Sequence, residues 1–301
     1  MTKHFLHRYK IPVSIGLIVL FLFFIVSGVF LFFDLDLHKE KTMVPKIAVS
    51  PTIVPTPTAT PSPTLTPTPV YTGYCLNIPV LMYHHVAPQS VAITRGFSSL
   101  NVDNNLFDQQ MGYIASHGFT TLFAEDLVNA LHNHATLPAK SIVISLDDGY
   151  DDVYNYAFPI AKKYGVKLTV MVPTGLLGVQ GPTNSYYTWG QLKDMLGSGL
   201  VHVGNHTWSH YPVGSGNAAK DQYEIATAQK ELQQNLGISP IVFAYPYGTN
   251  ANVLSVHREL QQNGILGAFS TIGGSVQCDS FIYSLHRTRI GNVAFPAYGI
   301  F

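Results

Sequence analysis

Short apolar segments alternate with helical patterns through residues 73–301, and this alternation limits the chain to a small set of folds. The apolar segments, which we predict to be strands, are residues 79–86, 141–147, 167–172, 201–205, 241–245, 267–271 and 283–290. The predicted helices between them are residues 105–117, 154–164, 189–196, 221–236 and 252–263. Apolar strands that are separated by helices are typical of parallel βαβ units. The pattern therefore predicts an α/β fold with either a barrel or a doubly wound sheet at its centre.

The first 33 residues have the features of a membrane signal anchor. Residues 1–10 contain Lys3, Arg8 and Lys10, and residues 11–33 form a run of 23 residues without a charge. As a helix this run is about 34 Å long, which is enough to cross the hydrocarbon core of a bilayer. The basic residues before it predict a cytoplasmic N-terminus at residues 1–10, with the rest of the chain outside the cell. Cleavage of the segment as a signal peptide is the alternative, and it also exports the rest of the chain.

Residues 34–72 are predicted to be an extracellular linker. Within them, residues 50–69 contain seven Pro and seven Thr in 20 positions. Alternating Pro removes backbone donors and disfavours helix in each preceding residue. Such a segment is expected to be a disordered, extended spacer of about 3.1 Å per residue. Residues 73–301 are then the only part of the chain that can bury a core.

The composition excludes several classes of protein. The chain carries 17 basic and 17 acidic residues, and residues 73–301 contain no basic run, which argues against a nucleic-acid partner. No G-x-G-x-x-G motif follows the first predicted strand, and this excludes a dinucleotide-binding fold. Two cysteines, Cys75 and Cys278, are too few for a Cys-rich zinc module. They are either a disulfide that ties the ends of the domain together or two free thiols.

Carboxylates and imidazoles follow two of the predicted strands directly. Asp147 and Asp148 come at the end of one strand, and His206 and His210 follow another. The carboxyl ends of parallel strands meet at one edge of a sheet, which is where the functional residues of such folds lie. Two imidazoles and one carboxylate can hold a metal ion and leave coordination positions open. A solvated turn is the alternative for the two aspartates taken alone.

Three motifs in order resemble those of the polysaccharide deacetylases, the NodB-homology or carbohydrate esterase family 4 domain. They are SLDDG at residues 145–149, HTWSH at residues 206–210 and FAYPYG at residues 243–248. The resemblance extends from Ile78 to about Ile290, and it implies a distorted (β/α)7-type barrel. The segments PVLMYHHV, FAYPYG and LHRTRI look most like the branch that deacetylates poly-N-acetylglucosamine-type exopolysaccharides.

The resemblance implies a role for each matching residue. Asp148, His206 and His210 would bind one divalent metal ion, for which Zn²⁺ is our first choice and Co²⁺ or Ni²⁺ also suit the ligands. Asp147 would be the general base of the hydrolysis, and the backbone N–H of Tyr247 would help to hold the oxyanion.

Two positions depart from the family pattern. The third motif has Ala244 where the family has an Arg that orients the catalytic Asp, and we expect Arg287 or Arg289 to replace it. His286 is the candidate for the general acid of the family's last motif. Because side chains alternate along a strand, only one of His286 and Arg287 can point into the barrel.

The remaining predictions concern substrate, partners and location. His84, Tyr245 and Trp208 are candidate contacts to sugar rings, although aromatic residues in α/β domains usually belong to the core. We expect a membrane-anchored hydrolase with a monomeric extracellular domain that removes N-acetyl groups from an N-acetylglucosamine-containing polysaccharide, such as an exopolysaccharide, peptidoglycan or a chitin-like glycan. An O-acetyl esterase of a cell-wall polysaccharide and a non-catalytic carbohydrate-binding protein are the alternatives.

Overall fold

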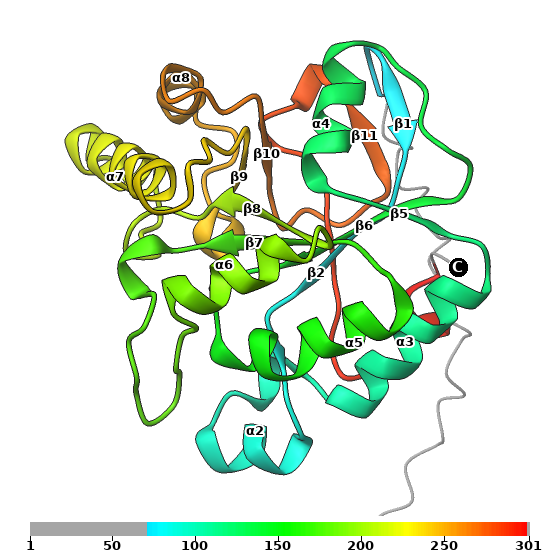
Figure 1. Cartoon of the computed structure of the whole chain (residues 1–301). Coiled ribbons are helices and arrows are strands. Elements are labelled where there is room, and N and C mark those ends of the chain that lie inside the picture. The colour runs from blue at the N-terminus through cyan, green and yellow to red at the C-terminus, as the bar shows by residue number, and fades with distance from the viewer. Residues whose placement is uncertain (1–70, 300–301) are drawn as a thin grey trace, which may run out of the picture. The chain divides into compact units, whose positions relative to one another are not determined.

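The computed structural model describes residues 71–299 (Figure 1). The predicted N-terminus 1–10, the signal anchor 11–33 and all but the last two residues of the linker 34–72 lie outside this range. Among the helices within the described residues, none has the length and apolar character needed to cross a bilayer.

A parallel sheet of eight strands forms the centre of the domain. Its strand order is β10-β9-β8-β7-β6-β2-β12, and β5 pairs with β6 beside this path. The strands are β2 (Val80–Tyr83), β5 (Thr120–Leu122), β6 (Ser141–Leu146), β7 (Leu168–Val172), β8 (Val201–Asn205), β9 (Val242–Ala244), β10 (Gly267–Phe269) and β12 (Thr288–Arg289). All its ladders are parallel, so the carboxyl ends of the strands point the same way.

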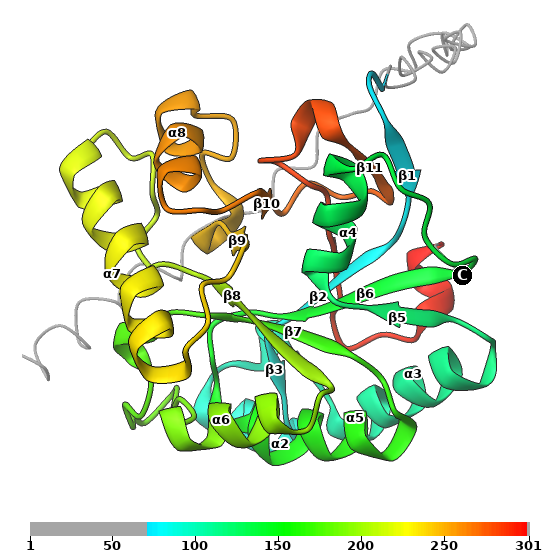
Figure 2. The ribbon, with the colours of Figure 1, turned by 45° about the horizontal axis from the view of Figure 1, so that its top comes forward.

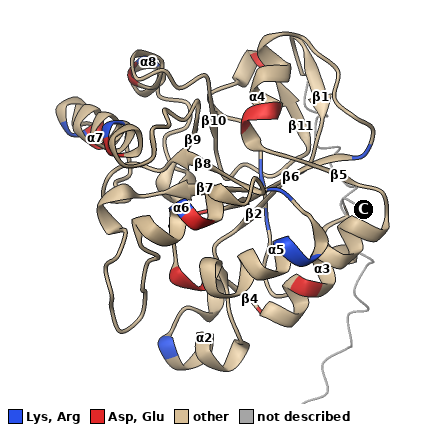
Figure 3. Cartoon of the chain, viewed as in Figure 1, with Lys and Arg blue, Asp and Glu red and all other residues tan. Residues whose placement is uncertain are grey.

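Helices cover the sheet. The α-helices are α2 (Gln89–Arg95), α3 (Asn104–Ser116), α4 (Ala124–His132), α5 (Phe158–Tyr164), α6 (Trp189–Gly197), α7 (Ala218–Leu236) and α8 (Leu254–Gln262). One π-helical turn (Val153–Ala157) leads into α5, and single 3₁₀ turns lie at Ser98–Leu100, Thr174–Leu176, Pro246–Gly248, Asp279–Phe281 and Phe295–Tyr298. Figure 2 shows α3, α5 and α6 on one side of the sheet and α4 on the other, with α7 and α8 near the β9–β10 end. Figure 3 shows the charged residues spread sparsely over these helices.

Both faces of the sheet are buried. In β6, Ile142, Ile144 and Leu146 pack in the cluster that includes residues of α3, α5 and α6, whereas Val143 packs in the cluster that includes α4. A strand that is buried on both faces has no polar alternation, which is why β6 reads as a continuous apolar run.

The last segment of the domain curls the sheet. The N–H of Leu285 donates to the carbonyl of Ala268, 2.9 Å away, and the N–H of Ser270 donates to the carbonyl of Leu285 at 2.8 Å. A few residues later, β12 pairs with β2, with Thr288 opposite Leu81. The segment thus lies beside β10 first and β2 afterwards. The α/β class and the parallel sheet are as predicted. The predicted distorted (β/α)7-type barrel is a curled half-barrel of eight strands instead, because β10 and β12 share no ladder.

Two small sheets complete the fold. The strand β1 (Cys75–Asn77) pairs antiparallel with β11 (Val276–Cys278), and Cys75 lies opposite Cys278. These two cysteines form a disulfide that joins positions 203 residues apart. Of the two alternatives, a disulfide or two free thiols, the structure has the disulfide. The second small sheet pairs β3 (His85–Val86) with β4 (Asn101–Val102).

Candidate active site

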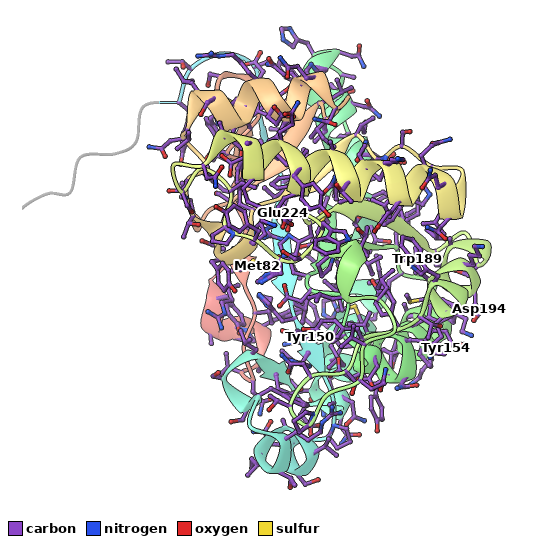
Figure 4. All side chains as sticks on the ribbon, turned by 90° about the vertical axis from the view of Figure 1, so that its left-hand side faces the viewer. Met82, Tyr150, Tyr154, Trp189, Asp194 and Glu224 are labelled. Atoms are coloured by element: carbon purple, nitrogen blue, oxygen red, sulfur yellow. A yellow bond between two sulfur atoms is a disulfide. The ribbon has the colours of Figure 1, made fainter. Side chains whose placement is uncertain are left out.

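A cavity of about 580 Å³ lies at the carboxyl ends of the sheet strands. It is lined by Met82 of β2 and by side chains that follow β2, β6, β8 and β9, together with Leu100, two residues of the loop before α6, Thr271 after β10 and Arg289 of β12. Figure 4 labels two residues of its wall, Met82 and Tyr150. The cavity is therefore at the edge of the sheet where the sequence predicted the functional residues.

Asp148, His206 and His210 converge at this cavity. The Oδ1 atom of Asp148 lies 3.1 Å from Nε2 of His206 and 3.0 Å from Nε2 of His210. One potential ligand atom from each residue lies within 4.8 Å of the other two. Nδ1 of His206 lies 2.8 Å from the carbonyl of Ala244, which fixes the ring with Nε2 facing Asp148 as the potential ligand atom. The donor set and its spacing fit a divalent metal ion.

The titration of these groups reflects their mutual contacts. Burial alone raises the pKa of Asp148, but hydrogen bonds from His206 and His210 outweigh burial and hold that pKa well below its usual range. Burial lowers the pKa of His206, but its bond to Asp148 and the charge of Asp147 outweigh this effect and raise it. The three groups therefore already favour a charged carboxylate in the middle of the triad.

Asp147 is held ionised by a buried arginine. The Oδ1 atom of Asp147 accepts from Nη1 of Arg287 at 2.7 Å, and Nη2 of Arg287 lies 2.7 Å from Oδ2. The two residues are 2% and 1% exposed. The same guanidinium donates to Oγ of Ser145 at 3.2 Å and to the carbonyl of Ser270 at 2.9 Å. Burial raises the pKa of Asp147, but Arg287 and other nearby charges outweigh it and lower that pKa.

The arginine that the third motif lacks thus comes from the last segment of the chain. Of the two candidates, Arg287 contacts Asp147, whereas Arg289 is exposed at the rim of the cavity and donates to the carbonyl of Ser99 at 3.3 Å. Ala244 has no side chain that could orient Asp147, but its backbone carbonyl fixes the ring of His206.

The expectation that His286 supplies the general acid is not supported by its position. The His286 ring stacks on Phe281, with ring centroids 4.7 Å apart, and it does not line the cavity. The alternation of side chains along the segment turns His286 outward because Arg287 points inward.

Tyr247 lies at the rim of the cavity in a left-handed backbone conformation. Its φ is 61°, its side chain is 66% exposed, and its ring lies 4.6 Å from that of His210. Within residues 71–299, no acceptor binds the N–H of Tyr247. Asp148, Thr207 and His210 also have positive φ values, and such strain is concentrated at functional sites.

The three predicted sugar contacts have different positions. His84 lines the cavity, and burial lowers its pKa despite the nearby carboxylates. Tyr245 also lines the cavity, but it is 1% exposed and its hydroxyl donates to the carbonyl of Tyr283 at 2.9 Å. The prediction for Trp208 is not supported, because its ring lies outside the cavity, beside Tyr223.

Sequence reasoning missed one wall of the cavity. Tyr150 lies over His85, with ring centroids 3.6 Å apart, and Asn184 and Tyr186 reach the cavity from the loop before α6. Arg95 of α2 holds this loop, because its guanidinium donates to Oγ of Ser185 at 2.9 Å. The position of Tyr150 two residues after Asp148 was the one available signal, since the loop is placed by tertiary contacts.

Comparisons with known proteins agree with the motifs. A model of the family described as polysaccharide deacetylase matches residues 134–265. The Bacillus subtilis protein YxkH is 27% identical over 226 residues, which are 73% of this chain and 75% of that protein. The poly-β-1,6-N-acetyl-D-glucosamine N-deacetylase of Staphylococcus aureus is 26% identical over 212 residues, 67% of this chain and 72% of that protein.

A solved structure extends the likeness to the fold. The deacetylase PplD of Streptococcus pyogenes, in complex with acetate, superposes with a TM-score of 0.65 at 27% identity. The match covers 75% of this chain and 97% of PplD. It therefore includes most of the described domain, and the family model contains both aspartates and both histidines of the site. The motifs, the relatives and the fold agree, and this chain is similar to the polysaccharide deacetylase family of hydrolases.

Proposed function

We propose that this protein removes N-acetyl groups from an N-acetylglucosamine-containing extracellular polysaccharide in a metal-dependent hydrolysis. The observation that carries the proposal is the ionised Asp147, held by Arg287, beside the triad Asp148, His206 and His210 in an open cavity. A carbohydrate-binding protein needs neither a positioned base nor a metal triad. The relatives named as N-deacetylases of poly-N-acetylglucosamine support the choice of an amide as the bond cleaved.

The triad would hold one divalent ion, with Zn²⁺ as the first candidate and Co²⁺ or Ni²⁺ as others that suit the donors. When bound, such an ion lowers the pKa of water and polarises the acyl oxygen of the substrate. The chain's own residues supply the remaining steps.

Asp147 accepts the proton of the water that attacks the acyl carbon, and Arg287 keeps its carboxylate ionised and oriented. The N–H of Tyr247 donates to the acyl oxygen as negative charge develops on it. The leaving amine requires a proton, and Asp147 returns to it the one taken from water. His84 faces the cavity together with both aspartates, and burial lowers its pKa, so we assign to its neutral imidazole the relay of that proton. Cleavage of the C–N bond then yields acetate and a free amino group.

Acetate release from defined glycans tests the proposal. Full-length protein with stoichiometric Zn²⁺ is expected to release acetate from N-acetylglucosamine oligomers and to leave primary amines on the sugar. Release from O-acetylated xylan alone would identify an esterase instead. Binding of the oligomers without any acetate release would identify the non-catalytic alternative.

We further propose that the chain is anchored in the membrane through residues 11–33 and that its domain is monomeric and extracellular. The charge pattern at residues 1–10 and the uncharged run that follows support this topology. Digestion of the domain by protease added to intact cells is expected, and protection of the domain would contradict the topology.

The arginine that replaces the family's usual one gives a specific prediction. In Arg287→Lys the charge remains but the two-pronged contact to Asp147 is lost, so we expect kcat to fall by about 10²-fold with little change in KM. Arg287→Ala should lower kcat further and also destabilise the fold, because breaking a buried ion pair costs about 3–5 kcal/mol of stability.

The matched control is His286→Ala, which removes the neighbouring side chain that points away from the cavity. Steady-state kinetics on folded protein, checked by circular dichroism, should rank His286→Ala close to the unchanged protein. A large loss of kcat in His286→Ala, with a nearly normal kcat in Arg287→Lys, would return the general-acid role to His286.

A further inference from the structure

The loop of residues 206–210 carries both histidines of the triad and has a strained backbone. Thr207 has a φ of 66° and His210 a φ of 61°. A non-glycine residue in this conformation costs about 1–3 kcal/mol and persists only where its surroundings hold it. The position of the two imidazoles therefore depends on contacts from outside the loop.

The two histidines are held in different ways. His206 is 1% exposed, and its Nδ1 lies against the carbonyl of Ala244 at 2.8 Å. Within residues 71–299, no acceptor contacts Nδ1 of His210, whose side chain is 19% exposed. Its side-chain contacts are Asp148 and the rings of His206 and Tyr247, with ring centroids 4.9 Å and 4.6 Å away. The orientation of His210 thus depends on the backbone that precedes it.

Glu224 of α7 binds that backbone. Its Oε2 atom accepts from the N–H of Ser209 at 2.7 Å, and its Oε1 atom accepts from Oγ of Ser209 at 2.7 Å. Glu224 is fully buried, at 0% exposure, and Figure 4 shows its place on α7. Hydrogen bonds to an ionised acceptor are about twice as strong as neutral ones. Two of them fix the residue directly before His210.

The carboxylate of Glu224 is charged. Nζ of Lys220, one turn earlier on α7, lies 2.7 Å from Oε1. Burial raises the pKa of Glu224, but the bonds from Lys220 and Ser209 outweigh it and lower that pKa. Burying a charged carboxylate is costly, and apart from Lys220 its partners all belong to Ser209. We therefore infer that the buried charge of Glu224 serves to hold the loop of residues 206–210.

We propose that Glu224 is a positioning residue for the metal centre, which clamps Ser209 and thereby presents His210 to the metal. The inference rests on the proposed function only in taking Asp148, His206 and His210 as the metal ligands. It predicts that loss of the clamp weakens metal binding before any substrate is present.

Zn²⁺ affinity and the Co²⁺ absorption spectrum test the proposal. The full-length protein is stripped with a chelator, titrated with Zn²⁺ by calorimetry, and loaded with Co²⁺ for visible spectroscopy. Loss of a partner that orients a metal ligand typically costs 10–100-fold in affinity. We expect about a 10-fold loss in Glu224→Gln, which keeps one acceptor oxygen, and up to about 100-fold in Glu224→Ala, with altered Co²⁺ bands in both.

Glu231→Gln is the matched control, because Glu231 lies two turns further along α7 and its carboxylate forms no hydrogen bond or ion pair within residues 71–299. It should bind Zn²⁺ as the unchanged protein does. Ser209→Ala removes one of the two clamp bonds and should lower Zn²⁺ affinity less than Glu224→Ala does. If Glu224→Ala does not fold, the Zn²⁺ affinity of Ser209→Ala is the deciding measurement.

Unchanged Zn²⁺ affinity and Co²⁺ bands in Glu224→Gln and Ser209→Ala, even with a lower Tm, would overturn the proposal and leave Glu224 a purely structural role. The readout is independent of catalysis. A protein whose Glu224 variants lose Zn²⁺ as expected, but which releases no acetate, supports this inference while it refutes the proposed function. An unchanged protein that binds no Zn²⁺ overturns both.

Discussion

Replacing Asp147 with Asn is expected to lower acetate release by about 10²–10⁴-fold, which is the usual contribution of a positioned general base. Asn keeps an oxygen that can accept from Arg287, but it cannot take a proton from water. The metal ligands are unchanged, so the variant should still bind one equivalent of Zn²⁺. Initial rates of acetate release at saturating substrate, with metal analysis of the same sample, measure both effects.

The control for this variant must separate lost chemistry from lost folding. Asp147→Asn leaves the buried guanidinium of Arg287 without its counter-charge, and such a change destabilises a fold. Rates are therefore compared below the measured Tm of the variant. Asp151→Asn, four residues along and outside the cavity, should retain its activity. A near-normal rate in Asp147→Asn would show that Asp147 is not the base.

His206→Ala should abolish activity by removing the metal. His206 supplies one of three ligand atoms and is the one fixed by a second bond, to the carbonyl of Ala244. Loss of an outer partner already costs about 10–100-fold in metal affinity, so loss of a ligand should exceed about 100-fold. Metal analysis after dialysis against dilute Zn²⁺ should find the variant empty.

His202→Ala provides the comparison on the same strand. His202 lies at the other end of β8, where its Nδ1 is 2.7 Å from Oε1 of Glu125 and its ring stacks on Phe123. We expect this variant to lose some stability and to keep its metal. Full metal content in His206→Ala would refute the assignment of the triad.

Features that depend on local periodicity could be predicted from the sequence. The apolar run of β6 ends at Asp147 and Asp148, and a period of two places Ser145 and Asp147 on one face. The same alternation anticipated that Arg287 and His286 point to opposite sides. These features follow from strand geometry, which a single sequence reveals.

Features that depend on tertiary contacts were missed. The short strand β5 is partly exposed and has no apolar run, and α4 begins after Phe123, whose side chain cannot cap a helix. Asp126 caps α4 instead, by accepting from the N–H of Phe123 at 2.9 Å. The packing of Trp208 also depends on tertiary contacts, since its ring lies near Gly175, where an added Cβ would lie 2.6 Å from it.

The same limit applies to the supports of the site. Glu224 follows His210 by fourteen positions on a separate helix, and only the packing of α7 brings it to Ser209. The pairing of Cys75 with Cys278 likewise depends on the register between β1 and β11. No spacing along the chain indicates either contact.

The most direct test of the account is acetate release from N-acetylglucosamine oligomers as Zn²⁺ is returned to chelated full-length protein. We expect no release from the metal-free protein and a rate that rises in proportion to bound Zn²⁺ until one ion is held per chain. A metal-free protein that releases acetate at the full rate, or a fully loaded protein that releases none from any N-acetylated or O-acetylated glycan, would contradict it.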